Sequence, residues 1–238
     1  MTHSSRVDGF VDQILRDLHA GKSEARAASV QRFFKEPVPS LGWRTDALRR
    51  LARSYRKEIG DHAVLLDVAE ILFKKSQPHE SKTVGVLLLE PLAEKFGDLE
   101  FRRFEKWLPH IASWDACDGL CLYLIAPLVA AEPRRARVVF RWAKSSNRWE
   151  RRGAAVSMVH CARRAIGFQE IFKLCDCLIE DTDDMVQKGV GWVLREVGKK
   201  SPARATPYLM KVRHCAPRLV LRTACEKLSV QQRKKILS

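Results

Sequence analysis

Residues 184–200 read DMVQKGVGWVLREVGKK, and this stretch decides the class of fold. Four valines in it lie at spacings of four, three and four residues, which places them on one face of a helix. They are Val186, Val190, Val193 and Val197. Apolar residues recur at helical spacing along nearly all of the chain, whereas alternating runs of β-branched residues between turn signals are missing. The sequence therefore predicts an all-α protein.

Outward from this helix, the chain shows a repeat. Candidate helix-pair starts fall near His79, Asp115, Asn147, Asp183 and Pro217, at separations of 32 to 36 residues. A pair of helices of this length buries its apolar face only by stacking on its neighbours, so the spacing predicts an α-solenoid with a curved inner surface. A globular helical bundle is the alternative. We expect one domain over residues 1–238, with N-terminal helices to about residue 78 and repeat pairs over 79–238.

The repeat pattern also predicts where the helices lie. We expect them at about 6–20, 24–35, 45–59, 62–75, 78–96, 99–111, 115–130, 134–144, 148–164, 168–180, 184–200, 203–213, 217–227 and 229–237.

The chain is strongly basic, and the charge is uneven. Its 238 residues carry 43 Lys and Arg against 28 Asp and Glu, a net charge of +15. Residues 1–119 hold 19 basic and 18 acidic side chains, whereas residues 120–238 hold 24 and 10. A positive field confined to one half indicates a polyanionic partner rather than a merely soluble surface.

Cysteine usage and hydropathy predict the compartment. The count of seven cysteines is odd, and the N-terminal residues include no apolar signal region, so we expect a reducing, cytoplasmic setting beside the nucleoid. The longest apolar stretch, residues 119–131, contains Pro127 and is shorter than the roughly 20 residues of a membrane helix. We expect a buried helix there and no membrane partner.

The face of helix 184–200 opposite the valines carries a Trp between cations. Lys188, Trp192, Arg195 and Lys199 repeat the valine spacing two positions later, about 200° around the helix. Cations suit phosphates, and an aromatic plane suits a base or sugar, so this face is a candidate nucleic-acid contact. The alternative is a Trp that packs between helices.

A second candidate begins at Ser113–Asp118, SWDACD, at the start of the apolar helix. Asp115 fits a cap or first-turn role at the positive end of the helix dipole. Asp118 instead leads an apolar stripe of Leu122, Ile125 and Val129. Because an ionised carboxylate is costly to bury without a cation or donors, Asp118 is either paired structurally or held for chemistry.

A third candidate is Asn147–Arg152, NRWERR, in which Arg148 and Arg152 lie one helical turn apart. Like charges at this spacing repel unless an anion joins them, and either a phosphate or Asp118 can serve. A solvated basic face is the favoured interpretation for Arg148 and Arg151.

Other chemistry finds no support in the sequence. The pairs Cys117/Cys121 and Cys175/Cys177 lack the C-x-x-C and H-x-x-x-H spacing of a zinc site, so we expect no metal. Without a P-loop, G-x-G-x-x-G or G-x-S-x-G motif, we expect no nucleotide cofactor and no esterase. His79–Glu80 is interpreted as a capping feature.

Three motifs carry a resemblance. They are W-D-x-x-D at Trp114, Asp115 and Asp118, N-x-W-x-x-R ending at Arg152, and QKGVGWVLRE at 187–196. With them the chain resembles the DNA alkylation repair enzymes of the AlkD type, which are DNA glycosylases built from HEAT-like helical repeats. The specific motifs lie between about residues 113 and 200, whereas the N-terminal third, including Gly42–Thr45, matches loosely.

The resemblance implies a function. It implies excision of N3- and N7-alkylated purines, such as 3-methyladenine and 7-methylguanine, from duplex DNA bound on a concave basic surface, leaving an abasic site. By motif position, Asp118 matches the catalytic aspartate, Arg152 the active-site arginine, and Trp114 and Trp192 the aromatic residues that line the lesion. Where the family often has a second aromatic before the first Trp, this chain has Ser113.

Around this implied site we expect phosphate contacts from five cations, a monomer, no cofactor, and no lysine nucleophile. The cations are Arg44, Arg148, Lys188, Arg195 and Lys199. Two other classes stay open: a non-catalytic repeat protein that binds distorted or branched DNA, and a repeat scaffold for other proteins.

Overall fold

The computed structural model describes residues 2–75 and 78–238, and all regular structure in them is helical. The chain forms two compact units, residues 1–95 (unit 1) and 96–238 (unit 2). The sequence predicts that N-terminal helices give way to repeat pairs near residue 78, whereas the boundary between the two units falls at Lys95. The interpretation as one domain stays a prediction.

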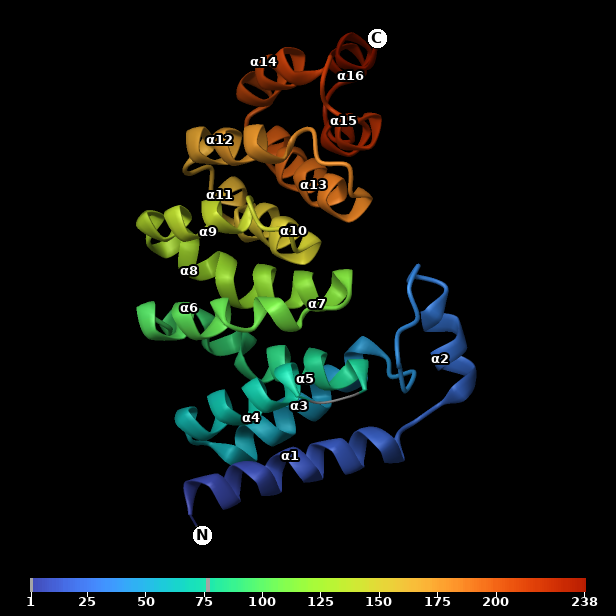
Figure 1. Ribbon diagram of the computed structural model, residues 1–238, viewed down its shortest axis with the longest axis vertical. Coiled ribbons are helices and arrows are strands. Elements are labelled where there is room, and N and C mark those ends of the chain that lie inside the picture. Colours follow the sequence, from blue (N-terminus) through green and yellow to red (C-terminus); the bar gives the residue numbers. More distant parts are fainter. Residues whose placement is uncertain (1, 76–77) are drawn as a thin grey trace. The chain divides into compact units, whose positions relative to one another are not determined.

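Over residues 2–75 and 78–95, unit 1 contains five α-helices and a 3-10 segment (Figure 1). They are α1 (His3–Ala20), α2 (Glu24–Gln31), α3 (Thr45–Ile59), α4 (His62–Lys74), α5 (His79–Leu89) and the 3-10 turn η1 (Glu90–Lys95). Helix α4 packs on α1 and α5, and α3 packs on α5. Their contact faces are fully buried apolar side chains such as Ile14, Leu72 and Leu88.

A buried carboxylate holds the loop before α3 in place. Glu80, in the first turn of α5, is 2% exposed. It accepts hydrogen bonds from the backbone N–H groups of Leu41 and Gly42, each at 2.9 Å, and from the hydroxyl of Ser40 at 2.6 Å. The capping role expected for His79–Glu80 is therefore wrong: Glu80 serves another segment because a carboxylate can accept several N–H donors at once.

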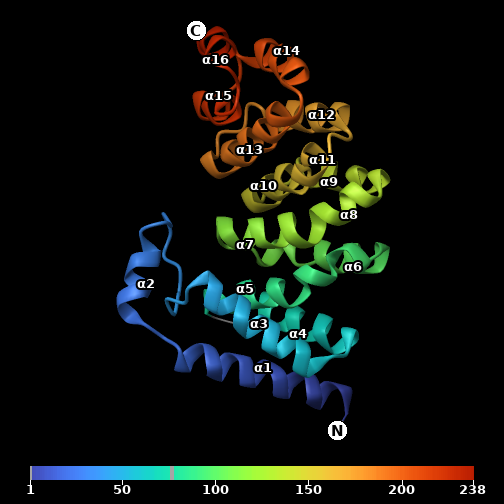
Figure 2. The same cartoon turned by 180° about the vertical axis from the view of Figure 1, so that it is seen from behind.

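Unit 2 contains the remaining elements, and its helices form two layers (Figures 1 and 2). The first layer comprises α7 (Trp114–Asp118), α10 (Arg148–Ser157), α13 (Asp184–Lys200) and α15 (Arg218–Cys225). The second comprises α6 (Asp98–Glu105), α9 (Ala136–Trp142), α12 (Phe168–Leu178) and α14 (Pro202–Val212). Completing the unit are η2 (Leu108–His110), the π-helix η3 (Gly119–Ile125), α8 (Ala126–Ala131), η4 (Pro133–Arg135), α11 (Val159–Arg163) and α16 (Val230–Leu237).

The predicted repeat is confirmed. Helices α5, α7, α10, α13 and α15 begin at His79, Trp114, Arg148, Asp184 and Arg218, each within one residue of an expected start. In unit 2, each first-layer helix packs on the next one, α7 on α10, α10 on α13, and α13 on α15. The fold is therefore all-α and built of stacked helical repeats, not a globular bundle.

Several predicted helices are shorter than expected. The stretch expected over 78–96 is regular only to Leu89, because Pro91 has no N–H to donate to the carbonyl of Leu87. That carbonyl instead accepts from Nη1 of Arg56 at 3.0 Å. The helices expected over 24–35, 99–111 and 148–164 end at Gln31, at Glu105 and at Ser157, the last being followed at once by α11.

The helix from Trp114 to Ala131 widens in its middle. Residues Gly119–Ile125 are π-helical, and the N–H of Ala126 bonds to the carbonyl of Cys121, five residues back. Pro127, which lacks the donor that an α-helix would need there, follows immediately. The wider turn changes the α-helical register predicted between Asp118 and Leu122.

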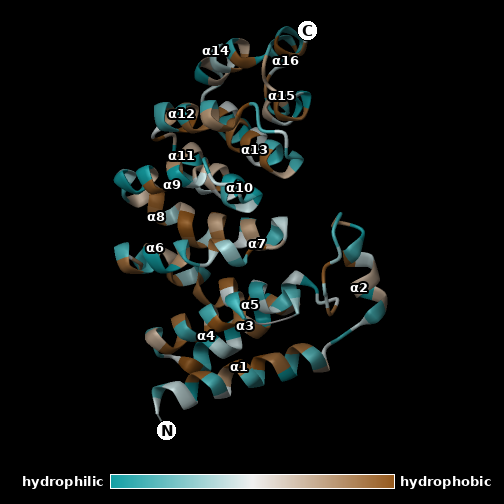
Figure 3. Cartoon of the chain, viewed as in Figure 1, coloured by the Kyte–Doolittle hydropathy of each residue, from teal (hydrophilic) through white to brown (hydrophobic). Residues whose placement is uncertain are grey.

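This helix has the length and mean hydropathy, 1.4 over Trp114–Ala131, that would also suit a membrane span. It is 67% buried within the protein, however, which is the environment of a core helix. Figure 3 shows apolar colours along it and hydrophilic colours on α6 and α9.

Candidate functional site

The site is built on a carboxylate–guanidinium pair between α7 and α10. Asp118 ends α7, and Arg152 lies in the second turn of α10. Nε of Arg152 donates to Oδ1 of Asp118 at 2.9 Å, and Nη2 donates to Oδ2 at 2.8 Å. This fork-to-fork geometry fixes the orientation of both groups. The sequence left open whether Asp118 or a phosphate joins the arginines, and the structure pairs Arg152 with Asp118.

Arg152 also ties the pair to α13. Its third nitrogen, Nη1, donates to the carbonyl of Met185 at 2.6 Å, in the first turn of α13. Asp183 caps that helix by accepting the N–H of Met185 at 2.8 Å. The guanidinium is thereby held by three consecutive first-layer helices.

Two helical glycines permit this close approach. A Cβ on Gly189 would lie 3.3 Å from Cγ of Arg152, and a Cβ on Gly153 would lie 2.9 Å from Sγ of Cys121. Gly153, Gly189 and the Met185 carbonyl are not among the site residues that the sequence predicts. A glycine inside a helical pattern is the signal that could have found the first two, since it costs helix stability unless something packs against it.

Burial sets the electrostatics of the pair. The side chain of Asp118 is 17% exposed and that of Arg152 is 7% exposed. Burial raises the pKa of Asp118 above its ordinary value, and the charge and hydrogen bonds of Arg152 oppose that rise. Burial by itself lowers the pKa of Arg152. The charge of Asp118 and its hydrogen bonds outweigh burial, so the pKa of Arg152 is raised and the guanidinium stays charged. The side chain of Asp118 as a whole keeps a small exposed area.

The two tryptophans are partly exposed and lie on α7 and α13, two of the helices that hold this pair. Trp114 lies four residues before Asp118 on α7 and so shares its face. Trp192 lies three residues, or about one turn, beyond Gly189, which contacts Arg152. Nε1 of Trp192 is buried and has no hydrogen-bond partner among the residues that the structure describes.

The valine face of α13 is fully buried, as predicted, and the cations of the opposite face are paired with carboxylates. Nζ of Lys188 lies 3.3 Å from Asp184, Nη1 of Arg195 lies 2.6 Å from Glu226, and Nζ of Lys199 lies 2.7 Å from Glu196. All three cations keep partial exposure, between 25% and 44% of the side chain.

Arg148 and Arg151 contact neighbouring side chains, whereas the sequence favours a solvated basic face for both. Arg148 lies over the ring of Trp149, 4.5 Å from its centroid, and 3.6 Å from Asp183. Arg151 pairs with Asp181 at 2.6 Å. Arg44 lies in unit 1, largely exposed and paired with Asp46, and its role in phosphate contact stays a prediction.

The cysteines near the pair are packing groups. Sγ of Cys117 donates to the carbonyl of Trp149, and burial raises the pKa of this thiol well above its ordinary value. A thiol held neutral is a poor nucleophile and a poor metal ligand. Within residues 2–75 and 78–238, no three His, Cys, Asp or Glu side chains gather as a metal site would require.

Together, stacked helical repeats and a buried, doubly hydrogen-bonded carboxylate at the first layer define an all-α repeat protein with a polar site on its helix stack. A family model described as DNA alkylation repair enzyme matches residues 14–228, and the chain belongs to this family. It is therefore a DNA alkylation repair protein with an enzymatic role and with DNA as its partner.

Solved structures share the fold. A structure described as a predicted DNA alkylation repair enzyme from Enterococcus faecalis is 19% identical, with a TM-score of 0.78 over 88% of this chain and 97% of that one. AlkD2 from Streptococcus mutans is 19% identical, with a TM-score of 0.59 over 79% and 92% of the two chains. The smu.31 protein of Streptococcus mutans UA159 is 17% identical, with a TM-score of 0.55 over 76% and 100%. No curated protein matches the sequence.

Proposed function

We propose that this protein is a monofunctional DNA glycosylase that hydrolyses the N-glycosidic bond of N3- and N7-alkylated purines, including 3-methyladenine and 7-methylguanine, in duplex DNA. The observation that carries the proposal is the side chain of Asp118, mostly buried yet 17% exposed, with its carboxylate held by two N–H groups of Arg152. Repair by this route leaves an abasic site.

To hydrolyse this bond, the protein must stabilise the developing sugar cation and position a water. An alkylated purine already carries a positive charge and leaves as a neutral base when its bond to C1′ breaks. The sugar then develops oxocarbenium character, which a fixed carboxylate stabilises. Each oxygen of Asp118 accepts one hydrogen bond from Arg152, so further lone pairs are left for a water. That water adds to C1′, and Asp118 orients it and takes its proton.

Trp114 and Trp192 support the cationic lesion. Their faces attract a cationic base or sugar by about 1–2 kcal/mol each when water is excluded. Ser113, at the position of the family's second aromatic, donates to Oδ1 of Asp115 at 2.7 Å and so fixes the first turn of α7.

We further propose that the duplex lies along the first-layer helices of unit 2. Lys188, Arg195 and Lys199 would exchange their carboxylate partners for phosphates, and Arg148 would contact the backbone beside the lesion. The nucleophile in this reaction is water, so no lysine is needed and strand cleavage is not part of the reaction. The enzyme acts as a monomer on nucleoid DNA in the cytoplasm.

Release of free base from methylated duplex DNA tests the proposal. We expect wild-type protein to release 7-methylguanine and 3-methyladenine, and Asp118→Asn to bind the same duplex while losing at least about a hundredfold in rate. Asp12→Asn, at an exposed position in α1, is the matched control and should retain the wild-type rate.

Two results would contradict it. If wild type binds DNA but releases no base, the protein is the non-catalytic DNA-binding alternative. If Asp118→Asn releases base at the wild-type rate, Asp118 is structural and the chemistry lies elsewhere.

A further inference from the structure

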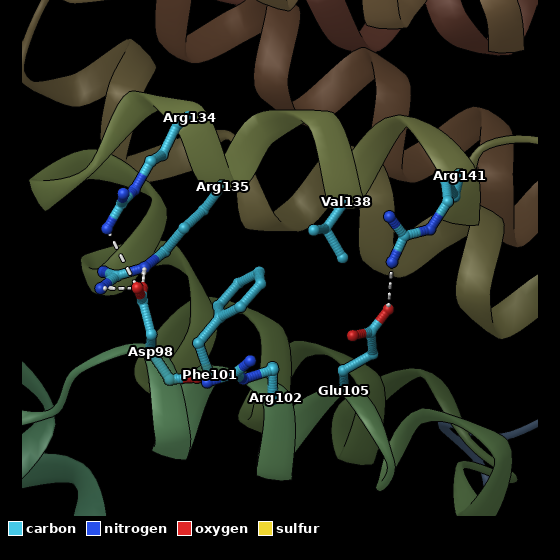
Figure 4. A pocket seen from close by; sticks show the side chains of 8 residues that line it. All are labelled: Asp98, Phe101, Arg102, Glu105, Arg134, Arg135, Val138 and Arg141. Carbon is cyan, nitrogen blue, oxygen red and sulfur yellow. Dashed lines mark hydrogen bonds and ion pairs between the residues drawn. The ribbon is translucent and has the colours of Figure 1, made fainter.

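Unit 2 carries a second polar cluster, on second-layer helices rather than on those that hold Asp118. A cavity of about 260 Å³ opens between α6 and the η4–α9 segment (Figure 4). We call it the arginine pocket, and it is lined by Asp98, Phe101, Arg102, Glu105, Arg134, Arg135, Val138 and Arg141. Four guanidinium groups therefore face two carboxylates, which leaves an excess of two positive charges.

At one end of the pocket, Asp98 is satisfied by a fixed partner. Nε and Nη2 of Arg135 lie 2.8 and 2.7 Å from Oδ1 of Asp98, and Nη1 of Arg135 donates to the carbonyl of Leu128 at 2.7 Å. Arg135 is only 11% exposed, and its hydrogen bond lowers the pKa of Asp98. Arg134 is a second partner of Asp98, at 3.0 Å, but is 66% exposed. Asp98 thus stays paired when Arg134 turns to another anion.

At the other end of the pocket, Glu105 likewise has one buried donor and one exposed partner. Oε1 of Glu105 accepts from the indole N–H of Trp142 at 3.0 Å and from Nη2 of Arg141 at 3.2 Å. Trp142 is 4% exposed and cannot leave, whereas Arg141 is 66% exposed. Glu105 therefore keeps a donor when Arg141 moves.

A third guanidinium is also available. Arg102 is exposed, and the hydrogen bond that the structure gives it, over residues 2–75 and 78–238, runs from Nε to the carbonyl of Asp98 at 3.3 Å. Figure 4 shows Arg102, Phe101 and Val138 in the middle of the pocket, between the Asp98 and Glu105 clusters. Phe101 is only 3% exposed, so the partly exposed Val138 is the apolar side chain that an occupant can reach. The pocket thus offers cations at both ends and an apolar centre at Val138.

This pattern favours a peptide over a nucleic-acid backbone. A phosphate chain presents like charges throughout, so Asp98 and Glu105 would repel it, and it has no apolar group for Val138. A peptide with an apolar side chain between acidic residues matches the centre and both ends, and its N–H groups can donate to the two carboxylates. Leu99, 73% exposed on α6, adds apolar surface on the same helix.

We propose that the arginine pocket docks a short acidic segment of a partner protein, with an apolar side chain against Val138 and flanking carboxylates on Arg134 and Arg141. The first-layer helices that carry Asp118 and Arg152 take no part in this contact. DNA and the partner can therefore be bound together.

Fluorescence anisotropy with the labelled peptide Gly-Asp-Glu-Leu-Asp-Glu-Gly tests the proposal. We expect saturable binding to wild type, and we expect the peptide affinity of the double variant Arg134→Glu/Arg141→Glu to be at least about tenfold weaker. Arg137→Glu/Lys144→Glu is the matched control, since both residues are exposed, lie on or just after α9 and do not line the pocket. It should bind within about twofold of wild type. Replacing the peptide's Leu by Gly should also weaken binding to wild type.

Equal peptide affinity in the two double variants would overturn the proposal. So would an absence of peptide binding to wild type together with weaker duplex DNA binding in Arg134→Glu/Arg141→Glu than in its control, which would make the pocket a DNA contact. If the charge-reversed protein does not melt like wild type, Arg134→Ala/Arg141→Ala replaces it, with Arg137→Ala/Lys144→Ala as its control and the same outcomes.

Discussion

At the scale of single residues, the stability of the site depends on how Asp118 is compensated. Its carboxylate is mostly buried and accepts two hydrogen bonds from Arg152. Removing one partner of such a pair leaves the other charge buried without compensation, which costs more than the pair itself contributes. The effect of losing Arg152 must therefore depend on whether Asp118 can take up a proton.

Arg152→Met tests this dependence. We expect it to lower the free energy of unfolding by about 3 kcal/mol at neutral pH. Burial already raises the pKa of Asp118, and without Arg152 nothing opposes the rise. A raised folded pKa means that folding favours the protonated acid, so the deficit is greatest at neutral pH and shrinks as the pH falls toward the unfolded value of about 3.9. Urea unfolding of wild type and variant between pH 4 and pH 7.5 measures it, and a deficit independent of pH would contradict it.

Much of this site could be predicted from the sequence. The placement of Asp118 among apolar residues predicts a buried carboxylate that needs a cation, and the spacing of Arg148 and Arg152 predicts cations that need an anion. Their pairing could not be derived, because it depends on how α7 and α10 approach each other. That approach rests on Gly153, whose contact with Cys121 exists only in three dimensions.

At the scale of elements, Gly153 sets how closely α10 packs on the π-helical segment. A Cβ there would lie 2.9 Å from Sγ of Cys121 and 3.5 Å from Cδ2 of Leu108. Because all three residues are buried, Gly153→Ala should destabilise the protein by about 1–2 kcal/mol, outweighing the gain in helix propensity.

Gly9→Ala is the matched control for this substitution. Gly9 lies in α1 with open space around its Cβ position, so the same change should stabilise the protein by about 0.5–1 kcal/mol. Thermal unfolding of both variants measures the two changes in stability, which should have opposite signs. A stabilising Gly153→Ala would mean that α10 can move away from the π-helical segment without a loss of stability.

The loop before α3 depends on another element, α5. Glu80→Gln replaces a carboxylate that accepts from Ser40, Leu41 and Gly42 with an amide that has one acceptor oxygen and presents donors to donors. We expect a loss of about 2–3 kcal/mol in the stability of unit 1. Hydrogen exchange at the amides of Leu41 and Gly42 should be faster in the variant than in wild type. Exchange rates equal to those of wild type would contradict the prediction.

The helix periods of the repeat are visible in the sequence, but the π-helical segment is not. Five predicted pair starts fall within a residue of α5, α7, α10, α13 and α15, since apolar spacing marks them locally and Asn147 and Asp183 cap α10 and α13. The turn over Gly119–Ile125 has the same apolar composition as an α-helix would have there. Only Pro127, just after this segment, hints that the ordinary hydrogen-bond pattern cannot continue.

At the scale of the whole molecule, charge governs the encounter with DNA. Residues 120–238 hold 24 basic and 10 acidic side chains, yet Lys188, Arg195 and Lys199 are each paired with a carboxylate in the structure. Binding must therefore exchange internal ion pairs for phosphates. The number of phosphates engaged, rather than the net charge, then sets the response to salt.

Measuring the affinity for duplex DNA between 50 and 200 mM salt counts these contacts. With about six phosphates engaged, the logarithm of the binding constant should fall against the logarithm of salt with a slope near −5, or about a thousandfold over this range. Lys188→Gln/Lys199→Gln should make the slope shallower by about 2, because two phosphate contacts are removed. Lys144→Gln/Lys173→Gln, two exposed lysines outside the first layer, should leave it unchanged. A wild-type slope near −1, or an equal change in both double variants, would show that the first-layer cations do not hold the DNA backbone.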